Sequence, residues 1–422
     1  MRVLMIGGGI GGLTAALSLH AAGIDVEVYE AVPKLQPLGV GINLLPHAVR
    51  ELSELGLQDE LAKIAIPTKE LIYANRHGQE IWREDRGLAA GYKWPQFSIH
   101  RGQLQMLLLD VARQRLGTDR VKTDHVFTRF EQSATAVRAY FTSQEGVDRG
   151  SVEGDVLIAA DGIHSRVRSL LYPNEGAPKW NGCVLWRGVT EGPPYLSGRS
   201  MVMAGHQDQK FVCYPISAEA HERGRSLINW IAEIRFKDRD LWRKESWNRG
   251  GDLNDFLPAF EIWQFEWLDV PQLIRDGSSI YEYPMVDRDP LERWTFGRIT
   301  LLGDAAHPMY PIGSNGASQA IIDARVLAYQ LAVTPDIDAA LKAYEEERRP
   351  ATSKIVLANR GNGPEQVMQL AEERAPNGFA HVYDVLPREE LEQIANNYKI
   401  TAGFESNRLN TQPSRTPPLR AN

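Results

Sequence analysis

The chain has 422 residues, of which 43% are hydrophobic and 24% are charged, as in an ordinary globular protein with a sizeable buried core. Its formal net charge of −7 gives no reason to expect nucleic acid or an anionic membrane surface as a partner. The first predicted strand begins at residue 2, which leaves no room for a signal peptide, and no apolar run approaches the ~18 residues of a membrane span, so we expect a cytoplasmic protein.

The chain opens with the pattern of a strand and a helix joined by a glycine-rich turn. The apolar stretch Arg2–Ile6 predicts a buried strand, and a helix is expected over residues 13–22. Between them Gly7, Gly9 and Gly12 have the G-x-G-x-x-G spacing. The first glycine permits a tight turn, the second lets a pyrophosphate approach the backbone, and the third lets the helix pack closely on the strand. The N–H groups at the helix start favour the phosphate charge.

The next predicted strand, residues 24–30, ends in a carboxylate, Glu30. In this position an acid can accept hydrogen bonds from ribose hydroxyls, and it repels a 2′-phosphate. A glycine-rich loop without a ligand is the alternative, but a strand, helix, second strand and terminal acid in register favour an adenine-dinucleotide site.

Further elements follow in chain order up to residue 160. They are a glycine-rich apolar loop at 37–43, a helix at 47–55, a hairpin at 71–82, a helix at 101–113, and strands near 123–130, 136–142 and 155–160.

The texture of the chain changes between about residues 180 and 285. Short aromatic and β-branched runs at 182–190, 210–216, 226–234 and 279–284, with a helical section at 254–263, indicate a mainly antiparallel sheet. A buried-strand pattern returns at 298–302, followed by predicted helices at 316–331 and 338–359.

Two later motifs each follow a predicted buried strand. The first is Asp161-Gly-Ile-His-Ser165, with Arg168 three residues on, and the second is Gly303-Asp304. An Asp-Gly turn alone is often only a turn. However, Asp304 lies at the carboxyl end of a strand, where open α/β sheets bind ligands, and the segment 311–316 then starts a helix whose backbone donors can face an anionic ring.

Together these motifs resemble those of the class A flavoprotein aromatic monooxygenases, the para-hydroxybenzoate hydroxylase fold group. The chain has that family's G-x-G-x-x-G, D-G-x-x-S-x-x-R and G-D-A-A-H-x-x-x-P in this order, and the resemblance extends from residue 2 to about 360. It implies an α/β (α+β two-domain) fold, with a Rossmann-like FAD-binding parallel sheet and a mainly antiparallel substrate sheet. Within the family the chain is most similar to phenazine-modifying members, on the segments Pro37–Asn43, Ser98–Gly102, Trp186–Glu191, Tyr283–Pro290 and Gly316–Ala320.

The resemblance also implies the cofactors and the chemistry. FAD is the cofactor, NADH or NADPH is a transient co-substrate, and dioxygen adds at the flavin C4a to form a hydroperoxide that hydroxylates an aromatic ring. No metal is required. The second G-x-G-x-x-G that a separate nicotinamide domain would need is missing from the sequence, so NADH and NADPH are not distinguished.

The family's cofactor contacts can be transferred to matching positions of this chain. The residues implied to hold FAD are Gly7, Gly9, Ile10, Gly11, Gly12, Glu30, Ala31, Val40, Gly41, Asn43, Arg101, Phe127 (a loose match), Asp161, Arg168, Gly303, Asp304, Pro311, Gly313, Asn315 and Gly316.

The resemblance divides the chain into parts. We expect residues 1–73, 99–178 and 285–360 in an FAD-binding domain and residues 74–98 and 179–284 in a substrate-binding sheet domain. Residues 361–403 should form a C-terminal helical segment, and residues 404–422 a disordered tail, because they are rich in Asn, Pro, Ser, Thr and Arg. The protein is expected to be a monomer or a homodimer.

The substrate is expected between the flavin and the antiparallel sheet. Arg187 could pair with a substrate carboxylate or be a structural ion-pair partner, and His307 is expected to be structural rather than a base. An aromatic in a strand is more often core than pocket, so the following are candidates only: Trp186, Arg187, Tyr214, Tyr283, Met309, Tyr310 and Pro311.

The favoured function is hydroxylation of a planar aromatic or heteroaromatic compound, such as a phenazine- or salicylate-like carboxylate, with decarboxylation where oxygen enters at the carboxyl-bearing carbon. One alternative is a flavin-dependent oxidoreductase or halogenase on the same fold, although Trp263-Gln-Phe-Glu-Trp267 has the wrong spacing for the halogenase pattern W-x-W-x-I-P. Another is a non-catalytic flavin-binding sensor. A plain NAD-dependent dehydrogenase predicts a colourless protein.

Overall fold

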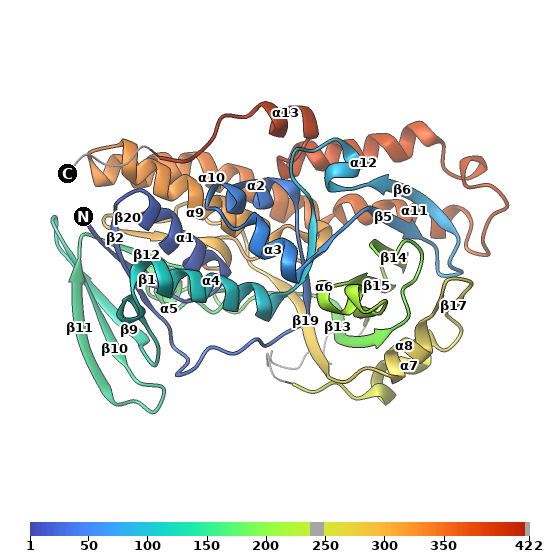
Figure 1. Cartoon of the computed structure of the whole chain (residues 1–422), viewed down its shortest axis with the longest axis horizontal. Coiled ribbons are helices and arrows are strands. Elements are labelled where there is room, and N and C mark those ends of the chain that lie inside the picture. Colours follow the sequence, from blue (N-terminus) through green and yellow to red (C-terminus); the bar gives the residue numbers. More distant parts are fainter. Residues whose placement is uncertain (237–248, 418–422) are drawn as a thin grey trace.

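The structure is a computed structural model that describes residues 1–236 and 249–417 (Figure 1). Two large sheets organise it, one in the left half and one in the right half of the view, and the long helices α9 (Gly316–Val333) and α10 (Ile337–Arg360) run along its upper side. Residues 237–248, part of the expected substrate domain, and 418–422, part of the expected tail, lie outside this description.

The first sheet is the predicted parallel sheet of the FAD-binding unit. Its strands β1 (Arg2–Ile6), β2 (Asp25–Tyr29) and β12 (Val156–Ala159) are parallel neighbours. Helix α1 (Ile10–Ala21) packs between α9 and α4 (Arg101–Leu116). Because helices cover the sheet, its strands are continuous apolar runs rather than alternating ones. Over the described residues the strand order is β20 (Thr295–Phe296), β21 (Ile299–Leu301), β12, β1, β2, β8 (Val121–Lys122).

The second sheet is mainly antiparallel, as predicted. Its long central strand β13 (Lys179–Gly192) pairs with β16 (Ser226–Arg235) and β19 (Ile280–Asp287). One pair is parallel, β14 (Ser200–His206) on β5 (Glu70–Ala74), and the sequence pattern did not indicate β14. In the described part of the chain the order is β19, β13, β16, β15 (Gln209–Pro215), β14, β5, β6 (Glu80–Asp85).

The two faces of the second sheet have different surroundings. On one face Trp186, Trp230 and Trp263 pack with residues of α7 (Leu253–Phe260) and α8 (Val270–Arg275) in one apolar cluster. The other face packs with residues of α11 (Gln366–Arg374) and α12 (Arg388–Ala402), and it also faces the parallel sheet. This second face is where a ligand can lie between the two sheets.

Smaller elements complete the fold. A three-stranded sheet of β3 (Gly41–Leu44), β7 (Phe97–His100) and β4 (Ile66–Pro67) connects the two large sheets, and β9 (Val126–Gln132), β10 (Val137–Thr142) and β11 (Asp148–Gly154) form an outer antiparallel sheet. The remaining helices and strands are α2 (Pro46–Glu54), α3 (Gln58–Ile64), α5 (Arg166–Leu171), α6 (Ala218–Glu222), α13 (Ser406–Thr411), β17 (Gln264–Phe265) and β18 (Leu268–Asp269). Short 3₁₀ turns lie at Gly87–Ala90, Thr118–Arg120, Gly303–Ala305, Ile312–Ser314, Gly363–Glu365 and Val382–Asp384.

Two expectations about segment limits differ from the structure. The substrate sheet begins at β5, residue 70, rather than at 74. The tail expected to be disordered is packed up to residue 417: Phe404 and Leu409 are 3% and 2% exposed, and Gln412 O accepts a hydrogen bond from Arg50 Nη2 at 3.1 Å. Composition favoured disorder, but Phe404 and Leu409 are buried in a cluster with residues of α12 and α10, and Phe404 stacks on His47 of α2.

In residues 1–236 and 249–417 there is no helix whose length and hydropathy would let it cross a membrane.

Candidate cofactor and substrate site

The three glycines of the opening turn have three different environments. Gly7 has a φ of +106°, and a Cβ there would lie 2.4 Å from Ala160 O. A Cβ on Gly12 would lie 2.1 Å from Gly7 O, whereas a Cβ on Gly9 would meet nothing within 4 Å. The fold therefore requires the outer two glycines, and the middle one leaves open space at the start of α1 where a phosphate can approach the N–H groups.

Glu30 and helix α4 fix this turn from two sides. Glu30 Oε2 accepts a hydrogen bond from Gly8 N at 2.6 Å, and its Oε1 accepts one from Val32 N at 3.0 Å. Gln105 Nε2 donates to Gly8 O at 2.9 Å. The residue expected to bind ribose thus also orients the phosphate loop.

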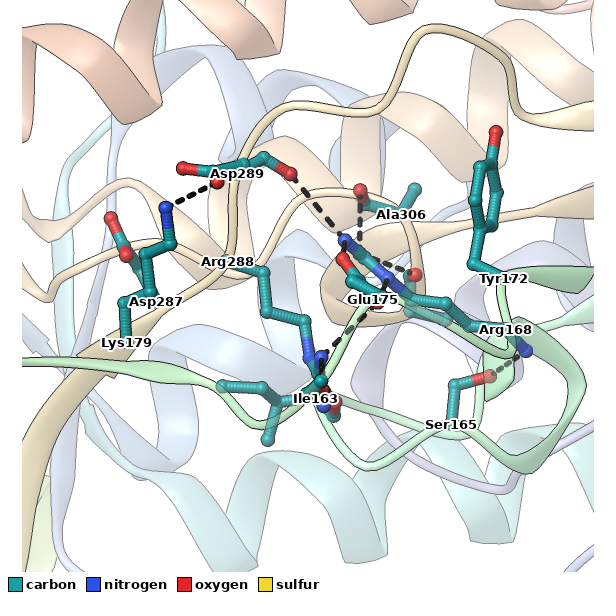
Figure 2. Close-up of polar contacts among 12 residues, drawn as sticks. Ile163, Ser165, Arg168, Tyr172, Glu175, Lys179, Asp287, Arg288, Asp289 and Ala306 are labelled. Atoms are coloured by element: carbon teal, nitrogen blue, oxygen red, sulfur yellow. Dashed lines mark hydrogen bonds and ion pairs between the residues drawn. The ribbon is translucent and has the colours of Figure 1, made fainter.

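The side chain of Arg168 contacts the backbone of the Gly303–His307 loop (Figure 2). Its guanidinium is 1% exposed and donates to the backbone oxygens of Ala305 and Ala306, each at 3.0 Å. It also pairs with Glu175, which Arg288 contacts at 3.1 Å. Arg168 therefore connects the Asp161 turn to the loop that carries Asp304.

A second buried group supports the same loop from α9. Asp323 Oδ2 accepts from Gly303 N at 3.1 Å and pairs with His307 Nε2, and its Oδ1 accepts from Arg348 Nε at 2.7 Å. Burial opposes ionisation of this carboxyl, but His307 and Arg348 outweigh it and hold its pKa at about 2. His307 is structural here, as expected.

Asp304 and Arg101 differ from these supporting groups because their side chains are open to an interior cavity instead of being packed against protein. The protein around the cavity raises the pKa of Asp304 and lowers that of Arg101, in each case through desolvation first. The Arg101 N–H donates to Val40 O at 2.9 Å, which fixes the start of α4 beside the Val40–Asn43 segment. A carboxylate and a guanidinium open to the same space fit hydroxyl and phosphate groups of a dinucleotide.

The Gly41 peptide is held by three side chains of the antiparallel sheet. Asn229 Oδ1 accepts from Gly41 N at 2.7 Å, and Gly41 O accepts from Tyr214 OH at 2.9 Å and Arg187 Nη2 at 2.7 Å. A Cβ on Gly41 would lie 2.7 Å from both Asn229 Cβ and Tyr214 Cε2. The sheet thus positions the segment expected along the flavin ring.

The C-terminal segment supports the 311–316 turn. Gly313 has a φ of +67°, and a Cβ there would lie 2.1 Å from Tyr398 OH. The Tyr398 hydroxyl accepts from Asn315 Nδ2 and donates to Asn359 Oδ1, both at 2.9 Å. Helix α12, for which the sequence predicted no role, is therefore part of the site's support.

One cavity of about 320 Å³ runs from the glycine turn to the antiparallel sheet. It brings together residues from all three predicted motifs and from both sheets. Of the residues predicted for the site, those that line it are Gly9, Ile10, Gly11, Gly41, Asn43, Arg101, Arg187, Tyr214, Gly303, Asp304, Met309, Pro311 and Gly316.

Other predicted residues lie away from the lining. Trp186 is on the opposite face of β13, stacked 4.9 Å from Phe256, because side chains alternate along a strand and its neighbour Arg187 faces the cavity. Phe127 packs edge-on against Phe141 in the outer sheet. The rest that do not line the cavity are Gly7, Gly12, Glu30, Ala31, Val40, Asp161, Arg168, Tyr283, Tyr310, Gly313 and Asn315.

Sequence reasoning missed the far end of the cavity. Val212 and Lys210 lie two and four residues before Tyr214 on the same face of β15, so alternation could have found them. Glu365 comes from a turn after α10, and nothing in the sequence near it signals a site. The further lining residues are Ile42, Ala160, Gly162, Met201, Met203, Ile231, Glu233, Leu302, Ile312, Ser314, Ala317 and Ala320.

The family model described as FAD binding domain matches residues 1–241 and 278–359 of the chain. The chain belongs to this family. The cavity fits FAD, since open space at Gly9, the exposed Asp304 and Arg101, and the turn at Gly316 all line it.

The chain is also similar to named hydroxylases. It is 48% identical over 363 residues to phenazine 1,6-dicarboxylic acid hydroxylase PhzS of Lysobacter antibioticus, covering 85% of this chain and 89% of the relative. It is 32% identical over 371 residues to a 3-amino-4-hydroxybenzoate 2-monooxygenase of Streptomyces platensis, covering 86% and 88%. The structure of Klebsiella pneumoniae HpxO complexed with FAD and uric acid matches with a TM-score of 0.75 and 27% identity over 96% of this chain and 97% of that one. The protein is an FAD-dependent monooxygenase that hydroxylates an aromatic compound, with the para-hydroxybenzoate hydroxylase-like fold that the sequence predicted.

Proposed function

We propose that this enzyme hydroxylates a phenazine carboxylate, a compound of the type of 5-methylphenazine-1-carboxylate, with loss of the carboxyl group where oxygen enters at the carbon that bears it. The observation that carries the proposal is the single cavity that joins the cofactor loops to an apolar slot between Met203, Val212 and Ile231. A planar fused ring fits such a slot because apolar walls bury its faces. The 48% identity to a phenazine hydroxylase supports the same substrate class.

The cofactor would be held by the residues that surround the first part of the cavity. The α1 N-terminus at Gly9 would face the pyrophosphate, and Asp304 would accept hydrogen bonds from the ribityl hydroxyls. Bound FAD, reduced by NADH or NADPH, supplies the oxygen chemistry that protein side chains cannot perform.

The chain's own residues would orient the ring and keep water out. Tyr214 and Arg187 hold the Gly41 peptide, and would thereby position the Val40–Asn43 segment against a bound flavin. Arg187 faces the cavity with Nε unpaired among the described residues, so its guanidinium can still bind a substrate carboxylate. Burial raises the pKa of Tyr214 to about 12, so this phenol remains a hydrogen-bond donor at neutral pH. The backbone at the start of α9, near Gly316, can stabilise negative charge on the reduced flavin.

Turnover with defined substrates tests the proposal. The purified holoenzyme is incubated with phenazine-1-carboxylate, 5-methylphenazine-1-carboxylate or salicylate, with NADH or NADPH, and the products are analysed by mass spectrometry. We expect a phenazine carboxylate to stimulate nicotinamide oxidation and to yield a hydroxylated product. Faster turnover of salicylate than of either phenazine, or halogenated rather than hydroxylated product when halide is present, would overturn it. The cytoplasmic location and the monomeric or homodimeric state stay predictions from the sequence.

A further inference from the structure

The far end of the cavity contains a buried cluster of one ammonium and two carboxylates. Lys210 on β15 lies 2.9 Å from Glu233 Oε2 on β16 and also pairs with Glu365. The three residues are 6%, 6% and 7% exposed, and all three line the cavity. Charged side chains are this deeply buried only when they are paired, and here one cation faces two anions.

The cluster is well separated from the flavin end of the same cavity. Tyr214 pairs with Asn229 across β15 and β16, Val212 with Ile231, and Lys210 with Glu233. Four residues along a strand span about 14 Å. The first pair holds the Gly41 peptide, and the last belongs to the charged cluster. Between them lies the apolar middle pair, which is level with Arg187 on β13.

The two ends differ in charge. Arg187 lies on β13 level with Ile231, and its Nη2 reaches Gly41 O at the flavin end, where Arg101 and a single carboxylate, Asp304, also line the cavity. At the far end two carboxylates accompany a single ammonium. Arg235 lies in a small cavity behind the cluster, but it is paired with Asp208 at 3.2 Å and does not line the slot. An anionic group is therefore favoured at Arg187 and opposed at Glu233 and Glu365.

We propose that this charge division selects and orients the substrate: a planar fused-ring monocarboxylate enters with its carboxylate at Arg187, and the Lys210–Glu233–Glu365 cluster rejects a second carboxylate on the far ring. The inference deepens the proposed function, on which it rests for the ring system. It predicts for this chain a substrate that differs from the dicarboxylic acid in the name of the similar hydroxylase. Specificity of this kind comes from an arrangement that is unfavourable for the wrong ligand.

The state of Glu233 strengthens the effect. Burial raises the pKa of Glu233 above its ordinary value and Glu365 adds to the rise, although Lys210 and, less strongly, Arg187 oppose it. A substrate carboxylate brought to this end meets either ionised Glu233, which repels it, or protonated Glu233, with which it must share a proton. Neither arrangement is as favourable as an uncharged ring edge. Bringing like charges together in a desolvated site is costly, so we expect the diacid to bind at least about tenfold more weakly.

Binding of two phenazines to the holoenzyme tests the inference. Phenazine-1-carboxylate and phenazine-1,6-dicarboxylate are titrated against the flavin absorbance spectrum of wild type and of two isosteric variants, Glu365→Gln and Glu233→Gln. Each variant leaves Lys210 with one carboxylate partner, so the cluster becomes neutral and the fold keeps its buried ion pair. Glu191→Gln is the matched control, because Glu191 is an exposed residue of β13 that pairs with Arg223 outside the cavity.

The expected result is a preference for the monoacid of at least about tenfold in wild type and in Glu191→Gln, reduced about tenfold in at least one of the two cluster variants. Equal or tighter binding of the diacid to wild type overturns the inference, and so does an unchanged preference in both Glu365→Gln and Glu233→Gln. Selective binding without hydroxylation of the monoacid would refute the proposed function and leave the charge rule in place. Failure of both phenazines to perturb the flavin would overturn both.

Discussion

Replacing Arg168 by Met tests whether a buried guanidinium prepares the cofactor site from behind. Arg168 donates to the carbonyls of Ala305 and Ala306, on the loop that carries Asp304, and it pairs with Glu175 (Figure 2). Methionine fills similar space but offers no donor. The variant therefore leaves two buried carbonyls unpaired without exposing the loop.

The size of the effect follows from those contacts. An unpaired buried carbonyl costs about 1–3 kcal/mol, so two cost at least about 2 kcal/mol. Glu175 retains Arg288 at 3.1 Å, which limits the further loss from the broken ion pair, and we expect about 3 kcal/mol in total. With an unfolding entropy of about 2.1 cal/mol/K per residue, this corresponds to a fall in Tm of roughly 3 °C for a chain of this length. If about half of the loss appears as disorder of the loop, FAD binds about tenfold more weakly.

The assay is fluorescence titration of the apoprotein with FAD, together with thermal unfolding. The matched control is Arg288→Met, which also loses the pairing with Glu175, but whose bonds to Ile163 O and Gly176 O lie outside the Asp304 loop. We expect weaker FAD binding in Arg168→Met only. If Arg168→Met has a lower Tm but an unchanged FAD dissociation constant, then Arg168 stabilises the fold without ordering the loop that carries Asp304, and the proposed effect on FAD binding is wrong.

Three further predictions concern the same site. Asp304→Ala should lose FAD during gel filtration, because the Asp304 carboxylate faces the cavity, whereas the control Asp338→Ala, at the exposed start of α10, should keep it. Equal flavin content in the two variants would show that Asp304 does not hold FAD. Asp323 has a pKa of about 2 in the fold against about 3.9 in an unfolded chain, so its ionisation stabilises the fold above about pH 4. This stabilisation, on the order of 2 kcal/mol, is lost as the pH falls towards 2. Urea unfolding between pH 5 and pH 3 should therefore depend less on pH in Asp323→Asn than in wild type, and an identical slope would contradict the assignment. Gly41→Ala should move the Val40–Asn43 segment, because the added Cβ would lie 2.7 Å from Asn229 and Tyr214. We expect a changed flavin absorbance spectrum and a free energy of unfolding lower by about 1–3 kcal/mol, with neither change in the control Gly361→Ala. A wild-type spectrum of Gly41→Ala would show that the segment tolerates the methyl group.

Features that depend on neighbouring residues could be predicted from the sequence. The strand–turn–helix at Gly7–Gly12, the Asp161 turn and the Gly303-Asp304 turn each need only a short pattern, and their common edge follows because the strands before them are parallel neighbours in one sheet. The antiparallel texture of residues 180–285 likewise predicted β13, β15, β16 and β19.

Features that depend on distant partners could not be predicted. Trp186 and Arg187 are adjacent on β13, and the sequence alone does not say which face of that strand borders the cavity, because both faces are covered and both carry apolar residues. Glu365 lies 155 residues from Lys210, so their pairing has no local signature. The sequence associated Arg168 with cofactor binding, but only the fold shows that it acts on the carbonyls of Ala305 and Ala306.

Isotope labelling of the product tests whether this enzyme inserts an oxygen atom from dioxygen into a phenazine ring. A single turnover of the FAD-loaded enzyme with phenazine-1-carboxylate and reduced nicotinamide is run under ¹⁸O₂ in unlabelled water, and the product is analysed by mass spectrometry. We predict one ¹⁸O atom in each hydroxylated phenazine, because the oxygen atom inserted by a flavin monooxygenase comes from dioxygen. Hydroxyl oxygen that comes from water, or oxidation of the nicotinamide without any labelled product, would contradict it.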